Sequence, residues 1–273
     1  MPWSSPARAL AAAAAPYARA RADRWAPVPA ELDARIAADA ALHQAARQAR
    51  KNLYDVLIQH LRNPQQSHLD AVLAVPRERF VLPEDIAHSA DDVPMPLDAE
   101  GHATVSAPHA YLLTFGLLDL CPGDCLVELG TGTGYGAALA RRIVGPRGRV
   151  VTVEIDRSLH QRAARLLADP STGGGGAPEN APVETLLGDG RELAPVLIAK
   201  GMPSGLGRLK IAITYACTSI PEPIERCLPE GGCLVAPVGA TEEHQELVRL
   251  ERRKAVLWQT SHGAVRYVTE RTP

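Results

Sequence analysis

Short apolar runs recur through the second half of the chain, separated by helical patterns or by turns. Five runs have the length and aliphatic content of buried strands: residues 126–129, 150–156, 183–187, 209–215 and 233–237. Three later segments alternate apolar and polar positions as antiparallel strands do: residues 245–250, 255–259 and 264–269. Strands that alternate with helices and then end in β structure predict an α/β fold. We expect a doubly wound sheet, mostly parallel with an antiparallel C-terminal part.

Helical spacing marks the region before these strands. Apolar residues between 31 and 62 fall near one stripe, which predicts two or three helices in a helical N-terminal extension over residues 1–75. Prolines are frequent in residues 76–108, so an ordered loop without regular helix is expected there, lying across the face of the sheet. A helix should follow over residues 109–120. The main domain is therefore predicted to cover residues 76–273.

Two further segments of the main domain have distinct patterns. A helix is expected after residue 156 and should reach about residue 167. Residues 169–182 include four consecutive glycines and are expected to form a flexible surface loop. A short helix is expected at residues 224–227.

The most informative stretch is residues 125–140, which read CLVELGTGTGYGAALA. An apolar strand here runs into a glycine-rich turn and then into an alanine-rich helix. Glycine allows a sharp turn and lets a ligand approach the backbone closely. Open α/β sheets bind nucleotide-like ligands at such turns. A purely structural tight turn is the alternative interpretation.

The spacing of the glycines distinguishes between cofactors. A dinucleotide fingerprint needs G-x-G-x-x-G, but Tyr135 occupies the position three after Gly132, and the glycines run G-x-G-x-G. Glu128 precedes the first glycine by two residues and favours a ligand with positive charge, such as S-adenosylmethionine with its sulfonium and ammonium. Glu154, near the end of the next predicted strand, could accept hydrogen bonds from two ribose hydroxyls.

Composition narrows the possible partners. The chain has 273 residues, a formal net charge of −2 and a pI near 6.5, which gives no basic field for nucleic acid. It has no apolar run long enough to span a membrane. Five cysteines stand without paired knuckles or nearby histidines, so no metal is expected. The alanine-rich start is similar to a signal peptide only in part, because its apolar stretch is short and ends at Pro16; a cytoplasmic protein with reduced thiols is expected.

The order of several motifs resembles the protein-L-isoaspartate O-methyltransferase family of class I S-adenosylmethionine-dependent methyltransferases. The resemblance covers about residue 72 to the C-terminus and rests on these segments: residues 75–81, 104–108, 128–135, 188–190, 228–232, 237–239 and 265–268. The glycine turn is common to many methyltransferases, whereas the Thr-x-Ser-x-Pro loop at residues 104–108 is more specific. The resemblance implies a Rossmann-like methyltransferase domain.

The resemblance also implies an activity and a set of site residues. Members methylate a carboxylate of isoaspartyl or aspartyl residues in peptides or proteins. Such a carboxylate is already ionised at neutral pH and needs no general base or metal. Ser106 would hold the acceptor carboxylate, with Thr104 as a second candidate. The implied cofactor residues are Glu128, Gly130, Thr131, Gly132, Gly134, Glu154, Ile155, Asp189 and Gly190. The glycines would lie against the methionine part, Glu154 against the ribose, and Asp189 with Gly190 by the adenine, although Asp189 could also be only a turn residue.

Departures from the family pattern lie on the acceptor side. Ala107 stands where glutamine is usual, residues 191–208 form a longer link, and residues 214–217 read TYAC in place of a run of small residues. The N-terminal extension is also longer than a compact repair enzyme needs. Three alternatives remain: tailoring of an aspartate or C-terminal carboxylate in a ribosomal natural-product peptide, a non-catalytic cofactor-binding module, and a nicotinamide-dependent oxidoreductase, which Tyr135 argues against. The role of the extension and the oligomeric state stay open.

Overall fold

The structure is a computed structural model that describes residues 40–98, 101–172, 180–199, 207–241 and 244–271. The chain divides into two compact units, residues 1–113 and 114–273. The boundary predicted after residue 75 stays a prediction. None of the helices in the described residues is long and apolar enough to cross a membrane.

Helices and short irregular elements make up the described part of the first unit. In chain order they are α3 (Ala40–His60), α4 (Gln66–Ala74), η1 (Arg77–Arg79), η2 (Pro83–His88), β1 (Met95–Pro96), β2 (Thr104–Val105) and α5 (Pro108–Leu118), which continues into the second unit. The predicted apolar stripe is only partly present in α3: Leu53 and Leu57 are buried, but Val56 is exposed. Residues 31–39 of that stripe lie outside the described residues.

The proline-rich segment after α4 contains more regular structure than expected. The prediction of no regular helix is wrong at η1 and η2, which are short 3-10 helices. Pro83 occupies the first turn of η2, where a residue without an N–H group is tolerated. The short strands β1 and β2 pair as an antiparallel hairpin. The expected course of this segment across the sheet stays a prediction.

Arg77 holds the proline-rich segment in place. Its buried guanidinium donates to the carbonyl oxygens of Ser89 at 3.0 Å, Asp91 at 2.9 Å and Val93 at 2.8 Å. It also donates to the carbonyl oxygen of Ser106 at 3.0 Å. Because one side chain satisfies carbonyls of several loop residues, these loops share one anchor.

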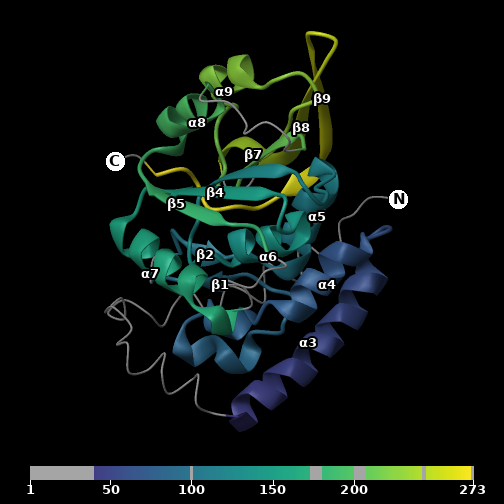
Figure 1. Ribbon diagram of the computed structural model, residues 1–273, viewed down its shortest axis with the longest axis vertical. Helices are drawn as coiled ribbons and strands as arrows, with labels where there is room; N and C mark the ends of the chain where they lie inside the picture. Colours follow the sequence, from purple (N-terminus) through teal and green to yellow (C-terminus); the bar gives the residue numbers. More distant parts are fainter. Residues whose placement is uncertain (1–39, 99–100, 173–179, 200–206, 242–243, 272–273) are drawn as a thin grey trace. The chain divides into compact units, whose positions relative to one another are not determined.

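A seven-stranded sheet forms the centre of the second unit, with the order β5-β4-β3-β6-β7-β8-β9 (Figure 1). Its strands are β3 (Cys125–Leu129), β4 (Arg149–Glu154), β5 (Val183–Leu187), β6 (Leu209–Ile213), β7 (Cys233–Thr241), β8 (His244–Arg253) and β9 (Val256–Val265). Its helices are α6 (Tyr135–Val144), α7 (Arg157–Ala168), α8 (Gly190–Ala199) and α9 (Glu222–Cys227). The five neighbours β5-β4-β3-β6-β7 are parallel, whereas β8 pairs antiparallel with both β7 and β9. This confirms the predicted doubly wound sheet, mostly parallel with an antiparallel C-terminal part.

Several predicted element boundaries need correction. Strand β4 ends at Glu154 because Asp156 caps α7, where its carboxylate accepts the N–H groups of Ser158 and Leu159. The tail contains two long strands, β8 and β9, in place of three short ones. The third predicted strand, residues 264–269, is wrong: its first two residues end β9, and the rest makes one isolated bridge.

Two connections are also more ordered than predicted. Residues 191–199 of the predicted long link lie in α8, a helix that contains Pro195. The predicted flexible loop begins with a 3-10 helix, η3 (Pro170–Thr172), and the buried Thr172 hydroxyl donates to the Leu166 carbonyl at 2.6 Å. Residues 173–179, which include the four glycines, lie outside the described residues.

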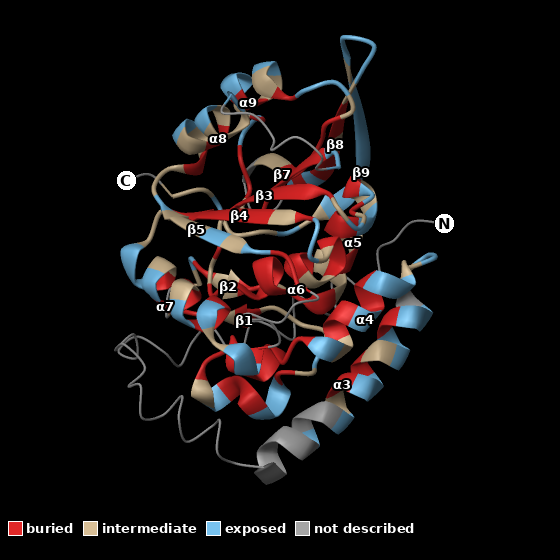
Figure 2. Cartoon of the chain, in the orientation of Figure 1, coloured by how far each residue is buried: buried red, intermediate tan, exposed pale blue. Residues whose placement is uncertain are grey.

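The core of this unit lies along the central strands, and Figure 2 shows β3 and β4 as largely buried. Every residue of β3 is buried. A continuous apolar run is expected of a strand that is covered on both faces of a parallel sheet. Glu128 is the exception in β3, and its partners are described with the site.

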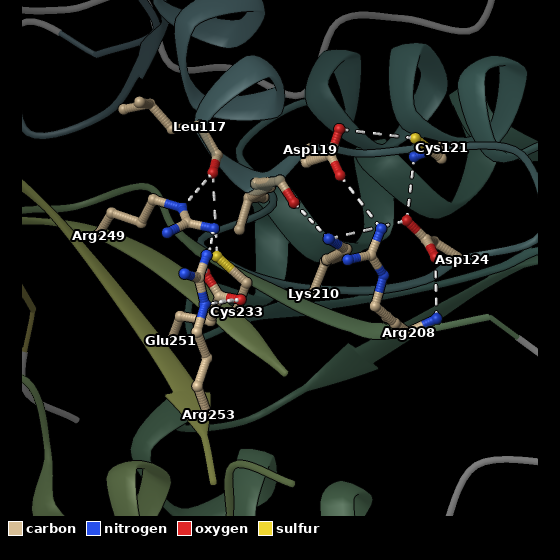
Figure 3. A network of polar contacts seen from close by, with 11 residues as sticks. Leu117, Asp119, Cys121, Asp124, Arg208, Lys210, Cys233, Arg249, Glu251 and Arg253 are labelled. Carbon is tan, nitrogen blue, oxygen red and sulfur yellow. Dashed lines mark hydrogen bonds and ion pairs between the residues drawn. The ribbon is translucent and has the colours of Figure 1, made fainter. Parts of the chain in front are cut away.

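A polar network fixes the carboxyl end of α5 (Figure 3). The carbonyl oxygen of Leu117 accepts Arg249 Nε at 2.7 Å, and that of Leu118 accepts the buried Lys210 ammonium. Asp124, just before β3, lies 4.0 Å from Lys210 Nζ. Cations satisfy the last carbonyls of a helix and interact favourably with its dipole. Since Lys210 lies at the start of β6, this network is at the amino ends of the parallel strands.

Candidate cofactor site

The strand order places a ligand site at the end of β3. From β3 the chain continues through β4 and β5 on one side, whereas β6 and β7 lie on the other side. The order therefore reverses between β3 and β6. Ligands of open α/β sheets bind outside the carboxyl ends of the strands at such a switch point. The glycine turn follows β3 there.

The three predicted cofactor glycines of the turn have left-handed backbone: φ is +99° at Gly130, +56° at Gly132 and +93° at Gly134. A Cβ at Gly130 would lie 2.3 Å from Thr214 Oγ1, and one at Gly134 would lie 3.0 Å from Leu167. Only glycine meets both conditions without strain or displacement. The glycines at 130 and 134 are therefore required by packing within the fold, at the switch point where a ligand is expected.

Glu154 is bonded directly to the glycine turn. Its Oε2 accepts the Gly132 N–H at 2.8 Å and its Oε1 accepts the Asp156 N–H at 3.0 Å. Burial raises the pKa of Glu154, and the two backbone hydrogen bonds oppose that rise. A carboxylate has further lone pairs, so Glu154 can still accept from two ribose hydroxyls. Ile155, the next predicted residue, is half-buried.

Glu128 lies in a buried chain of hydroxyl groups. Thr152 Oγ1 donates to Glu128 Oε2 at 2.7 Å and lies 2.6 Å from Thr131 Oγ1. Burial raises the pKa of Glu128 to about 8, with a smaller rise from the charge of Glu154, while the Thr152 hydrogen bond opposes it. These hydrogen bonds connect Glu128 through Thr152 to the predicted cofactor residue Thr131. A contact of Glu128 with a cationic ligand stays a prediction.

Asp189 and Gly190 lie at the end of β5 and the start of α8. The Asp189 carboxylate accepts the Arg191 N–H at 2.8 Å and the Arg191 Nη2 at 2.6 Å. These hydrogen bonds hold the pKa of Asp189 below its ordinary value. A Cβ at Gly190 would lie 3.1 Å from the Cβ of Leu129. Asp189 is thus a turn residue in this structure, and its predicted contact with adenine stays a prediction.

Four residues near this site were not predicted from the sequence. They are Thr152, Arg191, Thr214 and Tyr215. Thr214 Oγ1 lies 2.9 Å from the Leu129 carbonyl and 2.7 Å from that of Gly130, and Tyr215 Cδ1 would lie 3.2 Å from a Gly130 Cβ. Thr152 pairs with Glu128 across β3 and β4, and this register is not contained in the local sequence pattern.

The predicted acceptor residues belong to the first unit. Thr104 pairs with Pro96 in the β1–β2 hairpin. Half-buried Ser106 donates its N–H to Tyr111 Oη at 3.3 Å, while its carbonyl accepts Arg77. The Ser106 hydroxyl has no hydrogen-bond partner among the residues that the structure describes. A role for Ser106 and Thr104 in holding the acceptor carboxylate stays a prediction.

The residues of the second unit fit an S-adenosyl cofactor. The glycine turn follows β3 at the switch point, Glu154 keeps accepting capacity, and the buried Thr133 hydroxyl lacks a partner in the described part of the chain. The G-x-G-x-G turn at the switch point of the doubly wound sheet, with Glu154 at the end of β4, matches the class predicted from the sequence: S-adenosylmethionine-dependent methyltransferases.

Comparison with known proteins identifies the family. The family model described as protein-L-isoaspartate(D-aspartate) O-methyltransferase matches residues 48–272. A protein-L-isoaspartate O-methyltransferase of Methanothermobacter thermautotrophicus is 38% identical over 186 residues, which cover 68% of this chain and 77% of that protein. The chain belongs to the protein-L-isoaspartate O-methyltransferase family.

Two solved structures have the same fold. One is a protein-L-isoaspartate O-methyltransferase that is 26% identical, with a TM-score of 0.66. The match covers 82% of this chain and 66% of the other chain. The other, a putative protein-L-isoaspartate O-methyltransferase from Plasmodium falciparum in complex with S-adenosyl-L-homocysteine, is 16% identical with a TM-score of 0.65 and covers 82% and 97%. At that identity the second shows the fold alone.

Family membership confirms several expectations. The chain is a methyltransferase of this family, and S-adenosylmethionine is its cofactor. The family match begins at residue 48, inside α3, whereas the resemblance seen in the sequence begins near residue 72. The end of α3 and all of α4 therefore lie within the family match.

Proposed function

We propose that the protein methylates the free carboxylate of isoaspartyl or aspartyl residues in peptides or proteins, with S-adenosylmethionine as the methyl donor. The proposal is supported by the names of the relatives, which are protein-L-isoaspartate O-methyltransferases. The observation that carries it is the loop at residues 104–108. Arg77 donates to the Ser106 carbonyl there, and the Ser106 hydroxyl is still available to donate to a substrate.

The residues of the second unit would bind the cofactor and orient it. The cofactor supplies a methyl group that is activated by its attachment to a sulfonium. The backbone at Gly130 and Gly132 would lie against its methionine part, and the fixed Glu154 carboxylate would accept from its ribose. Orientation by rigid groups lowers the activation free energy of methyl transfer, because the entropy cost of bringing the reacting atoms together is met on binding.

The acceptor side requires positioning without a general base. A carboxylate is ionised at neutral pH and can attack a methyl group without losing a proton. Ser106 would donate a hydrogen bond to one carboxylate oxygen and leave the other free to react. Because Arg77 and Tyr111 hold the Ser106 main chain, they would limit where the Ser106 hydroxyl can lie.

A pair of peptides tests this proposal. The two peptides have one sequence and differ only in isoaspartate or aspartate at one position, and each is incubated with labelled S-adenosylmethionine. We expect faster methylation of the isoaspartyl peptide. Methylation of the aspartyl peptide alone would favour a dedicated aspartate acceptor, such as a tailored peptide. Cofactor binding with no transfer to either peptide would contradict the proposal.

A further inference from the structure

The C-terminal segment, residues 266–271, follows β9 and is bonded to the body of the second unit. The buried side chain of Gln245 in β8 makes two hydrogen bonds with the main chain of Tyr267: Oε1 accepts its N–H at 2.7 Å, and Nε2 donates to its carbonyl at 3.0 Å. An amide that is matched in both directions fixes the start of the segment in one position. The start of the segment, just after β9, is therefore fixed against β8.

The segment next bonds to the chain just after β6. The Ala216 N–H donates to the Val268 carbonyl at 2.8 Å, and the Ala216 carbonyl accepts the Glu270 N–H at 3.0 Å. These bonds form an isolated parallel bridge between Ala216 and Thr269. Ala216 lies at the carboxyl end of β6, which is one side of the switch point.

Two ion pairs then connect the segment to the other side. Glu270 lies 3.4 Å from Arg191, which also binds Asp189 at 2.6 Å. Arg271 Nη1 lies 3.4 Å from Asp156 Oδ2, and the Asp156 N–H donates to Glu154. Two of the predicted cofactor acids, Asp189 and Glu154, are thus each linked to the C-terminal segment through one intervening residue.

The strand order shows what the segment crosses. It is bonded at Ala216 after β6 and at Asp156 after β4, and β3 lies between these two strands. Its path therefore passes the carboxyl end of β3, where the glycine turn begins. In Figure 1 the yellow C-terminal segment runs from the side of β9 back across the sheet toward the label C.

We propose that Glu270 and Arg271 are positioning residues of the cofactor site. Glu270 orients Asp189 through Arg191. Arg271 holds Asp156 in place, and the Asp156 N–H in turn donates to Glu154. The inference rests on the proposed cofactor contacts of Glu154 and Asp189. If the segment served only to pack against the sheet, loss of its charges would change stability and leave cofactor affinity as it is.

The charges are partly accessible, which sets the size of the effect. The four side chains of the two pairs are 29 to 32% exposed. Pairs of this kind contribute little each and are screened by salt. We expect a loss of cofactor affinity of about twofold to fivefold for each single change and about tenfold for both together.

Calorimetric titration of S-adenosylhomocysteine into the full-length protein tests the inference. The variants are Glu270→Gln, Arg271→Gln and the double variant, with Arg226→Gln as the matched control. Arg226 forms an exposed pair with Glu222 on α9 and has no contact with the segment in the described residues. We expect weaker binding in the first three variants, wild-type binding in the control, and partial recovery with Arg271→Lys.

Salt dependence gives a second readout that does not need a variant. Affinity of the wild-type protein should fall between low and high salt, and the double variant should lose most of that dependence. Wild-type affinity in a folded double variant, or equal salt dependence in both proteins, would overturn the inference. A wild-type protein that binds no S-adenosylhomocysteine would refute the proposed cofactor site itself, which is a separate outcome.

Discussion

The change Gly130→Ala tests whether the glycine turn is required by its geometry. Gly130 has a φ of +99°, and a Cβ there would lie 2.3 Å from Thr214 Oγ1. A left-handed backbone costs an alanine about 1 to 2 kcal/mol. Displacement of the Thr214 hydroxyl removes a hydrogen bond to the Leu129 or Gly130 carbonyl, which is worth about 0.5 to 1.5 kcal/mol. The expected loss of unfolding free energy is therefore about 1.5 to 3.5 kcal/mol.

Urea unfolding measures this loss, and calorimetry with S-adenosylhomocysteine measures its effect on the site. We expect cofactor affinity to fall at least about tenfold, because the displaced turn carries the backbone that would contact the ligand. Gly116→Ala is the control, since Gly116 lies in α5 with nothing within 4 Å of its Cβ position. It should keep wild-type affinity and gain a few tenths of a kcal/mol, up to about 1 kcal/mol.

A double-mutant cycle separates the clash from the backbone strain. Thr214→Ala removes the hydroxyl that the new Cβ would meet. The double variant should be less destabilised than the sum of the single variants, by about 0.5 to 1.5 kcal/mol, because the same hydrogen bond is lost in both. Strict additivity, or a Gly130→Ala protein with wild-type affinity and stability, would refute this reasoning.

Three further predictions concern the acceptor, a buried acid and metal ions. Ser106→Ala should lower kcat/KM for the peptide about tenfold to a hundredfold, because one hydrogen bond to a charged group is worth about 1.5 to 3 kcal/mol, while cofactor affinity stays within about twofold; an equal loss of cofactor affinity would move Ser106 to the cofactor side. Burial raises the pKa of Glu128 from its ordinary value of 4.5 to about 8. Between these pH values the folded protein keeps a proton that the unfolded chain has released. The free energy of unfolding should therefore fall as pH rises from 4.5 to 8. Glu128→Gln should reduce that loss in urea unfolding at pH 5 and pH 8; an unchanged pH dependence would place the proton elsewhere. Activity should survive exhaustive chelation, and a rate restored by one divalent ion would contradict a metal-free mechanism.

Sequence reasoning succeeded where one local pattern determines one structure. The apolar run before Gly130 predicts a strand buried on both faces, and β3 is buried along its whole length. Alternation of strands and helices predicts the doubly wound order, because parallel strands need crossover connections. The position of Glu154 at the end of the second strand follows from the same pattern, and the structure bonds it to Gly132.

It failed where structure depends on contacts between distant segments. Residues 264–269 alternate like a strand, yet most of them lie beyond β9, where the main chain bonds to Ala216 instead of to a neighbouring strand. Arg77 reads as one charge in a proline-rich loop, but its role depends on carbonyls up to 29 residues away. The pairing of Glu128 with Thr152 needs the register of β3 and β4, which local patterns do not contain.

Mass spectrometry of one methylated peptide tests the central claim most directly. An isoaspartyl peptide is incubated with the protein and S-adenosylmethionine, and its mass is followed over time. We expect first the mass of a methyl ester and then loss of methanol, because a neighbouring backbone nitrogen displaces methoxide and closes a succinimide. An isoaspartyl peptide that stays unmodified while the protein binds cofactor, or a methyl group found on another residue, would contradict the account.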